Sequence, residues 1–363
     1  MKAAIISLGS KSSSMASDSM RKYFEVVDDI KLKNIEASLE NGEIKVLYEG
    51  KPFPKYDCIY AKGSFRYATL LRALTNHFYE TTYMPIAPDA FTIGHDKILT
   101  HLALLKQKVP QPKTYISSSP TAAKDILNKV NYPIVFKFPH GTQGKGVVFA
   151  DSFASASSLM DALETLKQPF LIQEYIDTSG VDIRAIVVGD KVVAAMKRKA
   201  VVGEARANIH AGGKGESFAP DFMINKIAVN TAEIIGAEIC AVDILESPKG
   251  PVVIEVNLSP GFQGITAATD MDVADKLAKY LFKKTSERFE SGKKEKETKV
   301  MEEIGLQMSN VPKQIITHLD FRGERILMPK LITSLSQLKE TDEVVISATK
   351  GNFSVKRFSK KKD

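Results

Sequence analysis

Cysteine is scarce in this sequence: only Cys58 and Cys240 occur among 363 residues, each within an apolar stretch. Two isolated thiols do not make the disulfide framework of a small secreted domain, so we expect buried free thiols in a reducing compartment. Long hydrophobic runs are also missing, because no run approaches the roughly 18 apolar residues that a membrane span needs. The apolar part of the opening segment MKAAIISLGS is too short for a signal peptide and predicts a first β-strand. We therefore expect a cytoplasmic protein without a membrane partner.

The two most familiar phosphate-binding loops are missing as well. In VFKFPHGTQGKGVVF, residues 135–149, the glycines Gly141, Gly144 and Gly146 fit neither G-x-x-x-x-G-K-[ST] nor G-x-G-x-x-G. The same stretch nevertheless places Lys137 in an apolar strand before a glycine-rich loop. A covered ammonium needs a partner, which a phosphate would supply, and glycines let backbone N–H groups approach phosphate oxygens. The alternative is a lysine at a strand edge beside a plain glycine-rich hairpin.

The bulk composition is that of an ordinary globular chain. The hydrophobic fraction is 44% and the charged fraction 26%, and 363 residues exceed the usual size of one domain, so we expect two or three. The net charge of +7 permits anionic ligands or nucleic acid. Part of that charge lies in SGKKEKETK and SKKKD, which we interpret as solvated surface.

Apolar patterns divide the chain into four parts. Residues 1–87 predict a small α/β domain with a helix near Phe65 to Phe78. Residues 88–290 predict a second domain, which opens with a helix marked by Ile98, Leu102 and Leu105. This domain contains a small α+β lobe at about 115–178, and Thr121 is the expected N-cap of the first helix of the lobe. Residues 291–299 lack periodicity and predict a charged, exposed linker. Residues 300–363 predict a small β-rich module with a hairpin turning at Lys350-Gly351-Asn352.

Two acidic residues interrupt apolar strands at a place suited to a metal ion. In VVIEVNLS, Glu255 and Asn257 are two residues apart and share a strand face, and Asp243 stands on the expected neighbouring hairpin strand. Three oxygen donors suit Mg²⁺ that also binds substrate phosphates. The alternative is an ordinary half-exposed hairpin, although an unpaired carboxylate within such apolar strands would be costly to bury.

A cationic group follows the predicted lobe. Arg184, Arg198 and Arg206, with Asn208, occupy the expected strands and the segment after them. Arginines at the ends of adjacent strands can converge on one anion and stabilise charge on a transferred phosphoryl group. Taken singly, each arginine is better explained as a surface residue.

The ordered series FKFPHGTQGKGVV, LIQEYI, DIRAIVVGD, RANIHAGG, AVDIL and IEVNLSPGFQGI resembles the ATP-grasp fold, and closely its RimK-type ribosomal-protein glutamate ligase branch. The resemblance runs from the first strand to about residue 285. It implies an α/β and α+β architecture in which an N-terminal pre-ATP-grasp α/β domain precedes the ATP-grasp domain. The module at 300–363 is not part of the basic family pattern.

The resemblance also implies a site. Arg198 is placed near the reactive phosphate, and Arg184 is a second expected catalytic residue. Asp243, Glu255 and Asn257 match the metal ligands for two Mg²⁺ or Mn²⁺ ions. The residues implied to bind ATP are Lys97, Lys137, Gly144, Gly146, Gln173, Glu174, Tyr175, Ile176, Asp182, Arg206 and Asn208.

The implied reaction is ATP-dependent carboxylate–amine ligation through an acyl phosphate. The expected amine is an amino acid, L-glutamate first, and the acceptor is a peptide, a protein C-terminus or a γ-glutamyl cofactor; an amino-acid carrier is the alternative within the family. We hypothesise that Arg66 and Arg184 bind substrate carboxylates, since these favour the arginine fork. Ser259 and Gly261 are further expected acceptor contacts.

An interpretation from another class is a non-catalytic ATP-binding scaffold that acts through the C-terminal module. That module would recruit a macromolecular acceptor, mediate a homo-oligomer (dimer or tetramer), or bind nucleic acid. Nucleic acid is the weakest of the three, because no aromatic stacking array accompanies the basic residues of SVKRFSKKKD.

Overall fold

The structure is a computed structural model that describes residues 1–141, 146–164, 167–199, 214–303, 320–323, 325–328, 332, 336, 338–339 and 341–358. The chain forms two compact units, Met1–Lys296 and Glu297–Asp363. Across the described ranges, no helix is long and apolar enough to cross a membrane.

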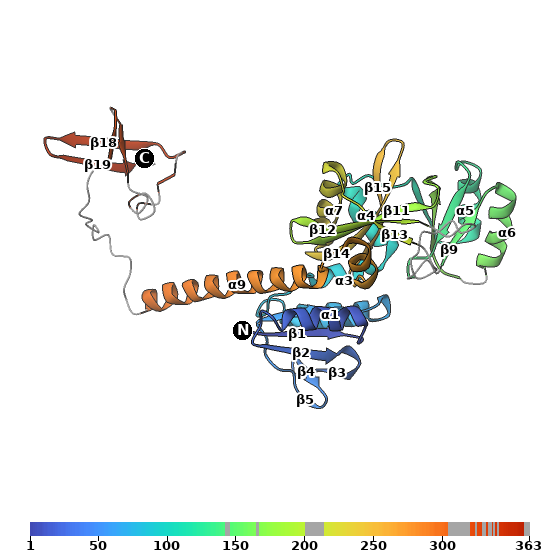
Figure 1. The fold of residues 1–363 in the computed structure, drawn as a ribbon, viewed down its shortest axis with the longest axis horizontal. Coiled ribbons are helices and arrows are strands. Elements are labelled where there is room, and N and C mark those ends of the chain that lie inside the picture. The colour runs from blue at the N-terminus through green and yellow to red at the C-terminus, as the bar shows by residue number, and fades with distance from the viewer. Residues whose placement is uncertain are drawn as a thin grey trace. The chain divides into compact units, whose positions relative to one another are not determined.

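The first unit begins with a parallel three-stranded sheet of order β2-β1-β6 (Figure 1). A small antiparallel sheet of order β3-β4-β5 follows β2 along the chain. The elements of this part are β1 (Lys2–Ser7), α1 (Lys11–Met20), β2 (Val26–Lys31), β3 (Ile35–Glu40), β4 (Glu43–Tyr48), β5 (Lys51–Pro52), β6 (Cys58–Ala61) and α2 (Ala68–Phe78). β1 and β6 are wholly apolar or nearly so, as expected for strands covered on both faces.

A four-stranded antiparallel lobe has the order β7-β10-β8-β9, with α5 and α6 against it (Figure 1). Its elements are β7 (Thr114–Ser117), α5 (Pro120–Leu127), β8 (Ile134–Lys137), β9 (Val147–Ala150), α6 (Phe153–Glu164) and β10 (Phe170–Glu174). The lobe has its own core, in which Phe136 and Phe170 pack with apolar residues of both helices. The N-cap of α5 is Ser119 rather than Thr121: its hydroxyl accepts from the Ala122 N–H at 3.2 Å, and Pro120 holds the first helical position.

The third sheet has five antiparallel strands in the order β13-β12-β11-β14-β15. The elements around it are α3 (Pro88–His95), α4 (Lys97–Lys106), β11 (Val181–Val188), β12 (Lys191–Lys199), β13 (Lys214–Ser217), α7 (Phe222–Ile235), β14 (Ile239–Ser247), β15 (Gly250–Asn257) and α8 (Gln263–Thr269). This sheet and the N-terminal sheet share one continuous core. The hairpins predicted at 188–191 and 247–250 are confirmed.

Two features differ from the sequence pattern. Helix α4 exists, but Leu102 and Leu105 are exposed, and the buried face carries Thr100, His101 and Leu104. The reason is a polar network: His101 Nδ1 lies 2.5 Å from Gln111 Oε1, and its Nε2 lies 2.9 Å from Gln173 Nε2. The charged segment 291–299 is also helical, since it continues helix α9 (Val273–Glu303).

In the second unit, the described strands are β16 (Asp320–Arg322), β17 (Arg325–Leu327), β18 (Val344–Thr349) and β19 (Asn352–Arg357). They form two antiparallel hairpins, β16-β17 and β18-β19. The second hairpin turns at Lys350 and Gly351, as the sequence predicts. The β-rich character of this segment is therefore confirmed for its described residues.

Candidate functional site

A row of three charged side chains, one arginine and two carboxylates, crosses the five-stranded sheet. Arg184 of β11 is the cross-strand partner of Asp243 on β14, and Asp243 is the partner of Glu255 on β15. Directly opposed residues of antiparallel strands point to the same face, so these side chains share one side of the sheet. Arg184 donates to Asp243 from Nε at 2.8 Å and from an Nη at 2.7 Å. The predicted metal ligand Asp243 is therefore held by a predicted catalytic arginine.

Arg198 of β12 extends this row. It donates to both oxygens of Asp182 at 2.6 and 2.5 Å, and it lies 2.9 Å from Asp243 Oδ2. The side chains of Arg198 and Asp243 are only 7% and 5% exposed. Burial opposes ionisation of Asp243, but the two arginines outweigh it and hold the pKa of that carboxyl below its usual value. Arg184 and Arg198 therefore converge on an internal carboxylate, Asp243.

Burial also acts on Asp182, the predicted ribose-binding acid. It raises the pKa of this carboxyl to about 6, against the pull of Arg198. Each oxygen accepts one hydrogen bond from the guanidinium, and these two bonds occupy about two of the four lone-pair positions of the carboxylate.

Two lysines from outside the five-stranded sheet lie near the carboxylates of Asp243 and Glu255. Lys97, the first residue of α4, lies 3.3 Å from Glu255 Oε1 and donates to the Gly141 carbonyl at 3.2 Å. Lys137, at the end of β8, is partly buried; burial lowers its pKa to about 8, and the charges of Glu255 and Asp243 act to raise it. The Lys97 N–H also donates to the Pro139 carbonyl, which fixes α4 against the end of β8. The two predicted phosphate lysines thus meet two predicted metal ligands.

The segment predicted to read adenine follows β10. The Gln173 side chain faces inward and donates to Thr114 Oγ1 at 2.8 Å, and its backbone lies in the central strand β10, between β7 and β8. The Glu174 carboxylate lies 3.3 Å from Lys113 Nζ. Tyr175 donates its N–H to the Pro133 carbonyl and sets its ring edge-on to Phe149. Ile176 comes next along the chain and is half-buried.

The glycine-rich loop after β8 is described in part. Gly146 has φ +77°, a conformation that disfavours other residues, and an added Cβ would lie 3.2 Å from Phe138 Cδ2. Its carbonyl accepts from the Phe138 N–H at 3.1 Å. The predicted residues Gly144, Arg206 and Asn208 lie outside the described residues.

The predicted acceptor residues gather around the loop after β15. Asn257 Oδ1 accepts from the Ser259 N–H at 2.9 Å, and Ser259 Oγ accepts from the Gly63 N–H at 3.0 Å. Gly261 is exposed. Arg66 is exposed and lies over the Phe65 ring at 5.4 Å. The structure does not bring Arg66 into hydrogen-bond contact with those predicted site residues that it describes.

Sequence reasoning missed the N-terminal contribution to this loop. Ser12 Oγ of α1 accepts from the Phe262 N–H at 3.0 Å and donates to Gln263 Oε1 at 2.8 Å. No local pattern signals a contact across 250 residues. Lys62 was also missed, although the sequence marks it in the same way as Lys137: both are lysines within an apolar stretch.

The predicted metal ligands supply only oxygen donors. A carboxylate has about four lone-pair positions, and the two hydrogen bonds from Arg184 and the ion pair with Arg198 leave one free on Oδ1 as far as the described residues are concerned. Glu255 is 40% exposed at its side chain and accessible to a cation. Within the described ranges, no group of three or more His, Cys, Asp or Glu side chains could hold a metal. Two carboxylates and the Asn257 amide remain a fitting set for a hard cation such as Mg²⁺.

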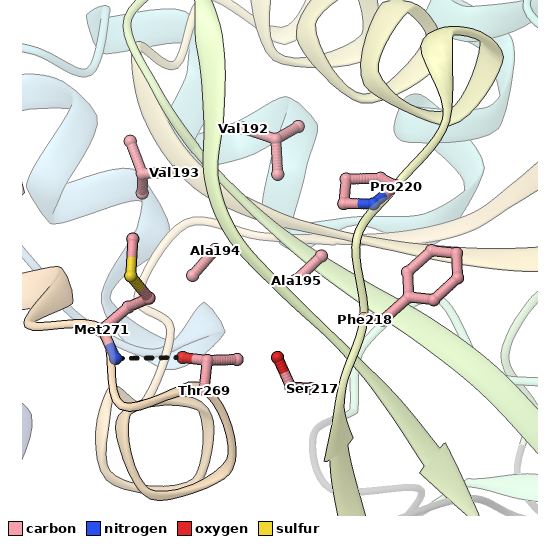
Figure 2. A pocket seen from close by; sticks show the side chains of 9 residues that line it. All are labelled: Val192, Val193, Ala194, Ala195, Ser217, Phe218, Pro220, Thr269 and Met271. Atoms are coloured by element: carbon pink, nitrogen blue, oxygen red, sulfur yellow. Dashed lines mark hydrogen bonds between the residues drawn. The ribbon is translucent and has the colours of Figure 1, made fainter.

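A cavity of about 170 Å³ lies elsewhere, between β12, the segment from Ser217 to Pro220, and the end of α8 (Figure 2). Its walls are Val192, Val193, Ala194, Ala195, Ser217, Phe218, Pro220, Thr269 and Met271. The predicted site residues that the structure describes do not line it. The charged cluster, not this cavity without charged side chains, has the groups that phosphate chemistry needs.

Comparisons with known proteins identify a family that this chain matches. Residues 94–281 match the family model described as RimK-like ATP-grasp domain. A protein of Marinomonas sp. (strain MWYL1), named probable alpha-L-glutamate ligase, is 37% identical over 260 residues, which are 71% of this chain and 86% of that protein.

Two solved structures are similar in fold. A RimK domain ATP-grasp protein from Sphaerobacter thermophilus has a TM-score of 0.61 at 18% identity and covers 77% of this chain and 99% of that one. The ATP-grasp ligase PsnB, solved with a precursor variant, Mg and ADP, has a TM-score of 0.60 at 18% identity and covers 78% and 98%.

Proposed function

This chain belongs to the RimK-like ATP-grasp family, and from that premise we propose that it is an ATP-dependent carboxylate–amine ligase that adds L-glutamate to an acceptor carboxyl group. The acceptor is a peptide, a protein C-terminus or a cofactor that ends in a carboxylate. The name of the Marinomonas relative supports L-glutamate, and the peptide precursor bound to PsnB supports a peptide acceptor.

The observation that carries this proposal is the meeting of Lys97 and Lys137 with Asp243 and Glu255 at one place. Lys97 forms an ion pair with Glu255, and the charges of Glu255 and Asp243 both act to raise the pKa of Lys137. Four charged side chains from two sheets and one helix have no structural need to converge. Such a set neutralises a polyphosphate and its cation when both are bound.

The reaction needs charge control rather than a protein nucleophile. A substrate carboxylate attacks the terminal phosphate of ATP, ADP departs, and the amine then displaces phosphate from the acyl phosphate to form the amide. Lys97 and Lys137 would neutralise the phosphate oxygens, while Arg184 and Arg198 keep Asp243 ionised. Mg²⁺ held by Asp243, Glu255 and Asn257 would supply further neutralisation of the transferred group.

Cys58 and Cys240 take no part in this chemistry. Both are buried, and burial raises the pKa of each thiol to about 12. Their free state supports the proposed cytoplasmic location. The use of two metal ions, the acceptance of Mn²⁺ and assembly as a dimer or tetramer belong to the same proposal.

The test is product analysis by mass spectrometry. We expect the full chain, given ATP, Mg²⁺, L-glutamate and a glutamyl-ended peptide, to yield the peptide extended by glutamate together with stoichiometric ADP. Glu255→Gln should abolish the product, whereas Glu246→Gln should not. Glu246 is a fitting control because it lies on the same hairpin and pairs with Lys197 at 2.6 Å, half exposed. ATP binding without turnover on any amino acid or acceptor would favour the scaffold instead.

A further inference from the structure

Lys62 is a buried lysine without a counterion. Its residue is 3% exposed, and its Nζ finds no hydrogen-bond partner among the described residues. The ammonium lies 4.5 Å from the centroid of the Phe262 ring and 5.6 Å from that of Tyr60. Aromatic faces compensate a cation only in part, and an unpaired buried charge is costly. Burial accordingly lowers the pKa of Lys62 to about 7.

The position of Lys62 is one where ligands bind. It directly follows β6, at the carboxyl edge of the parallel sheet β2-β1-β6, and ligands of open α/β sheets bind beyond such edges. The next residue, Gly63, donates its N–H to Ser259 Oγ. Ser259 itself follows the predicted metal ligand Asn257 by two residues. Lys62 is thus linked through one hydrogen bond to the loop that borders the reaction site.

The loop that covers Lys62 is held from the N-terminal side. Phe262, whose ring lies over the ammonium, donates its N–H to Ser12 Oγ. Gly261, one residue earlier, is exposed, so the loop reaches solvent there. A lysine stem has several rotatable bonds and moves its ammonium readily. Phe262 itself is fully buried, so an anion reaches Nζ from this side only when the ring moves aside.

We propose that Lys62 binds a carboxylate group of a substrate beneath the Ser259–Phe262 loop. The inference rests on the proposed function, which brings two carboxylate sources to the site: L-glutamate and the acceptor. An anion supplies the partner that Lys62 lacks, and a carboxylate accepts the hydrogen bonds that an ammonium donates.

The electrostatics around Lys62 give the binding a characteristic pH dependence. Burial causes the shift of its pKa, with no charged side chain of the described residues contributing. The titratable group packed beside it is Tyr60, and burial raises the pKa of that phenol far above the working range. Above about pH 7 the free amine is largely neutral, so a carboxylate must bind together with a proton. Affinity should therefore fall as the pH rises.

The experiment is calorimetric titration of the full chain loaded with Mg²⁺ and a non-hydrolysable ATP analogue. L-glutamate and a glutamyl-ended peptide form separate arms, which identify the source of the carboxylate. We expect Lys62→Met to weaken one arm at least about tenfold and Lys62→Arg to keep that affinity within about threefold. Affinity for the ATP analogue, measured in each variant, should be unchanged and reports on folding.

Proton uptake provides a readout that a packing role would not move. Titrations in two buffers of different ionisation enthalpy should show uptake in the wild type at pH above about 7 and none in Lys62→Arg, which stays charged. This comparison also decides the matter if Lys62→Met does not fold.

Three outcomes would overturn the proposal. They are equal affinity of Lys62→Met and wild type in both arms, equal loss in Lys62→Arg and Lys62→Met, and the same proton uptake in Lys62→Arg and wild type. Failure of the wild type to bind either ligand while it binds the ATP analogue would instead overturn the proposed function, and this inference with it.

Discussion

Breaking the ion pair between Arg198 and Asp182 by removing one partner should cost several kilocalories per mole, because both partners are buried. Arg198 is 7% and Asp182 11% exposed at the side chain, and the guanidinium also reaches Asp243. Replacing Arg198 by methionine keeps much of the volume but leaves the Asp182 carboxylate buried without a cation. Asp243 would retain Arg184. The cost therefore falls mainly at Asp182.

Removing one partner of a buried pair costs about 3–5 kcal/mol. The first unit spans residues 1–296, and unfolding entropy is about 2.1 cal/mol/K per residue, which gives roughly 0.6 kcal/mol/K for the unit. The expected decrease in Tm is then about 5–8 °C, if the unit melts in one transition. Scanning calorimetry measures the shift, and a single wild-type transition validates the arithmetic.

A surface pair provides the matched control. Arg72 and Asp89 lie 2.6 Å apart, almost the distance of the buried pair, but their side chains are 51% and 69% exposed. Exposed pairs contribute little, so Arg72→Met should lower Tm by less than about 2 °C. Equal shifts in the two variants would refute the reasoning that burial, rather than distance, sets the cost.

The same variant has a predictable pH dependence. Burial already raises the pKa of Asp182 to about 6, and loss of Arg198 removes the attraction that opposes this rise. A carboxyl with a raised folded-state pKa takes up a proton on folding, so its contribution to stability is present at low pH and is lost as the pH rises through the folded-state value. The Tm penalty of Arg198→Met should thus be larger near pH 8 than near pH 5. A penalty that grows on acidification would contradict the assignment.

Three further variants test other parts of the structure. Lys137→Met should raise the KM for ATP at least about tenfold, measured by ADP release, because a phosphate loses a nearby cation. Arg66→Glu should raise the KM for the acceptor and leave ATP affinity unchanged by calorimetry; unaltered acceptor kinetics would remove Arg66 from the site. Gly189→Ala should lower Tm by several degrees, since its φ is +66° and the new methyl would clash with the Tyr280 ring, whereas Gly42→Ala, with φ +79° and open space around it, should lose less.

Much of the fold was accessible from local pattern. The hairpins at 188–191 and 247–250 follow from alternating apolar strands joined by short turns, and both form as expected. Cap identity was less accessible, because Ser119 and Thr121 are both good caps and Pro120 decides between them by occupying the first helical position. The helical state of 291–299 was missed, since a charged segment without an apolar stripe gives no periodic signal.

For the candidate site, too, local sequence pattern predicts one part and not the other. The chemical groups could be listed from the sequence: lysines in apolar strands, a carboxylate two residues from an amide, and arginines on adjacent strands, in an order that resembles one family. Which of these charges meet depends on tertiary packing. Strand register places Arg184 opposite Asp243 and Asp243 opposite Glu255, and a helix start brings Lys97 to Glu255. The contact of Ser12 with the Phe262 loop and the isolation of the Lys62 ammonium arise from segments some 200 residues or more apart in the chain, whose packing no local pattern encodes.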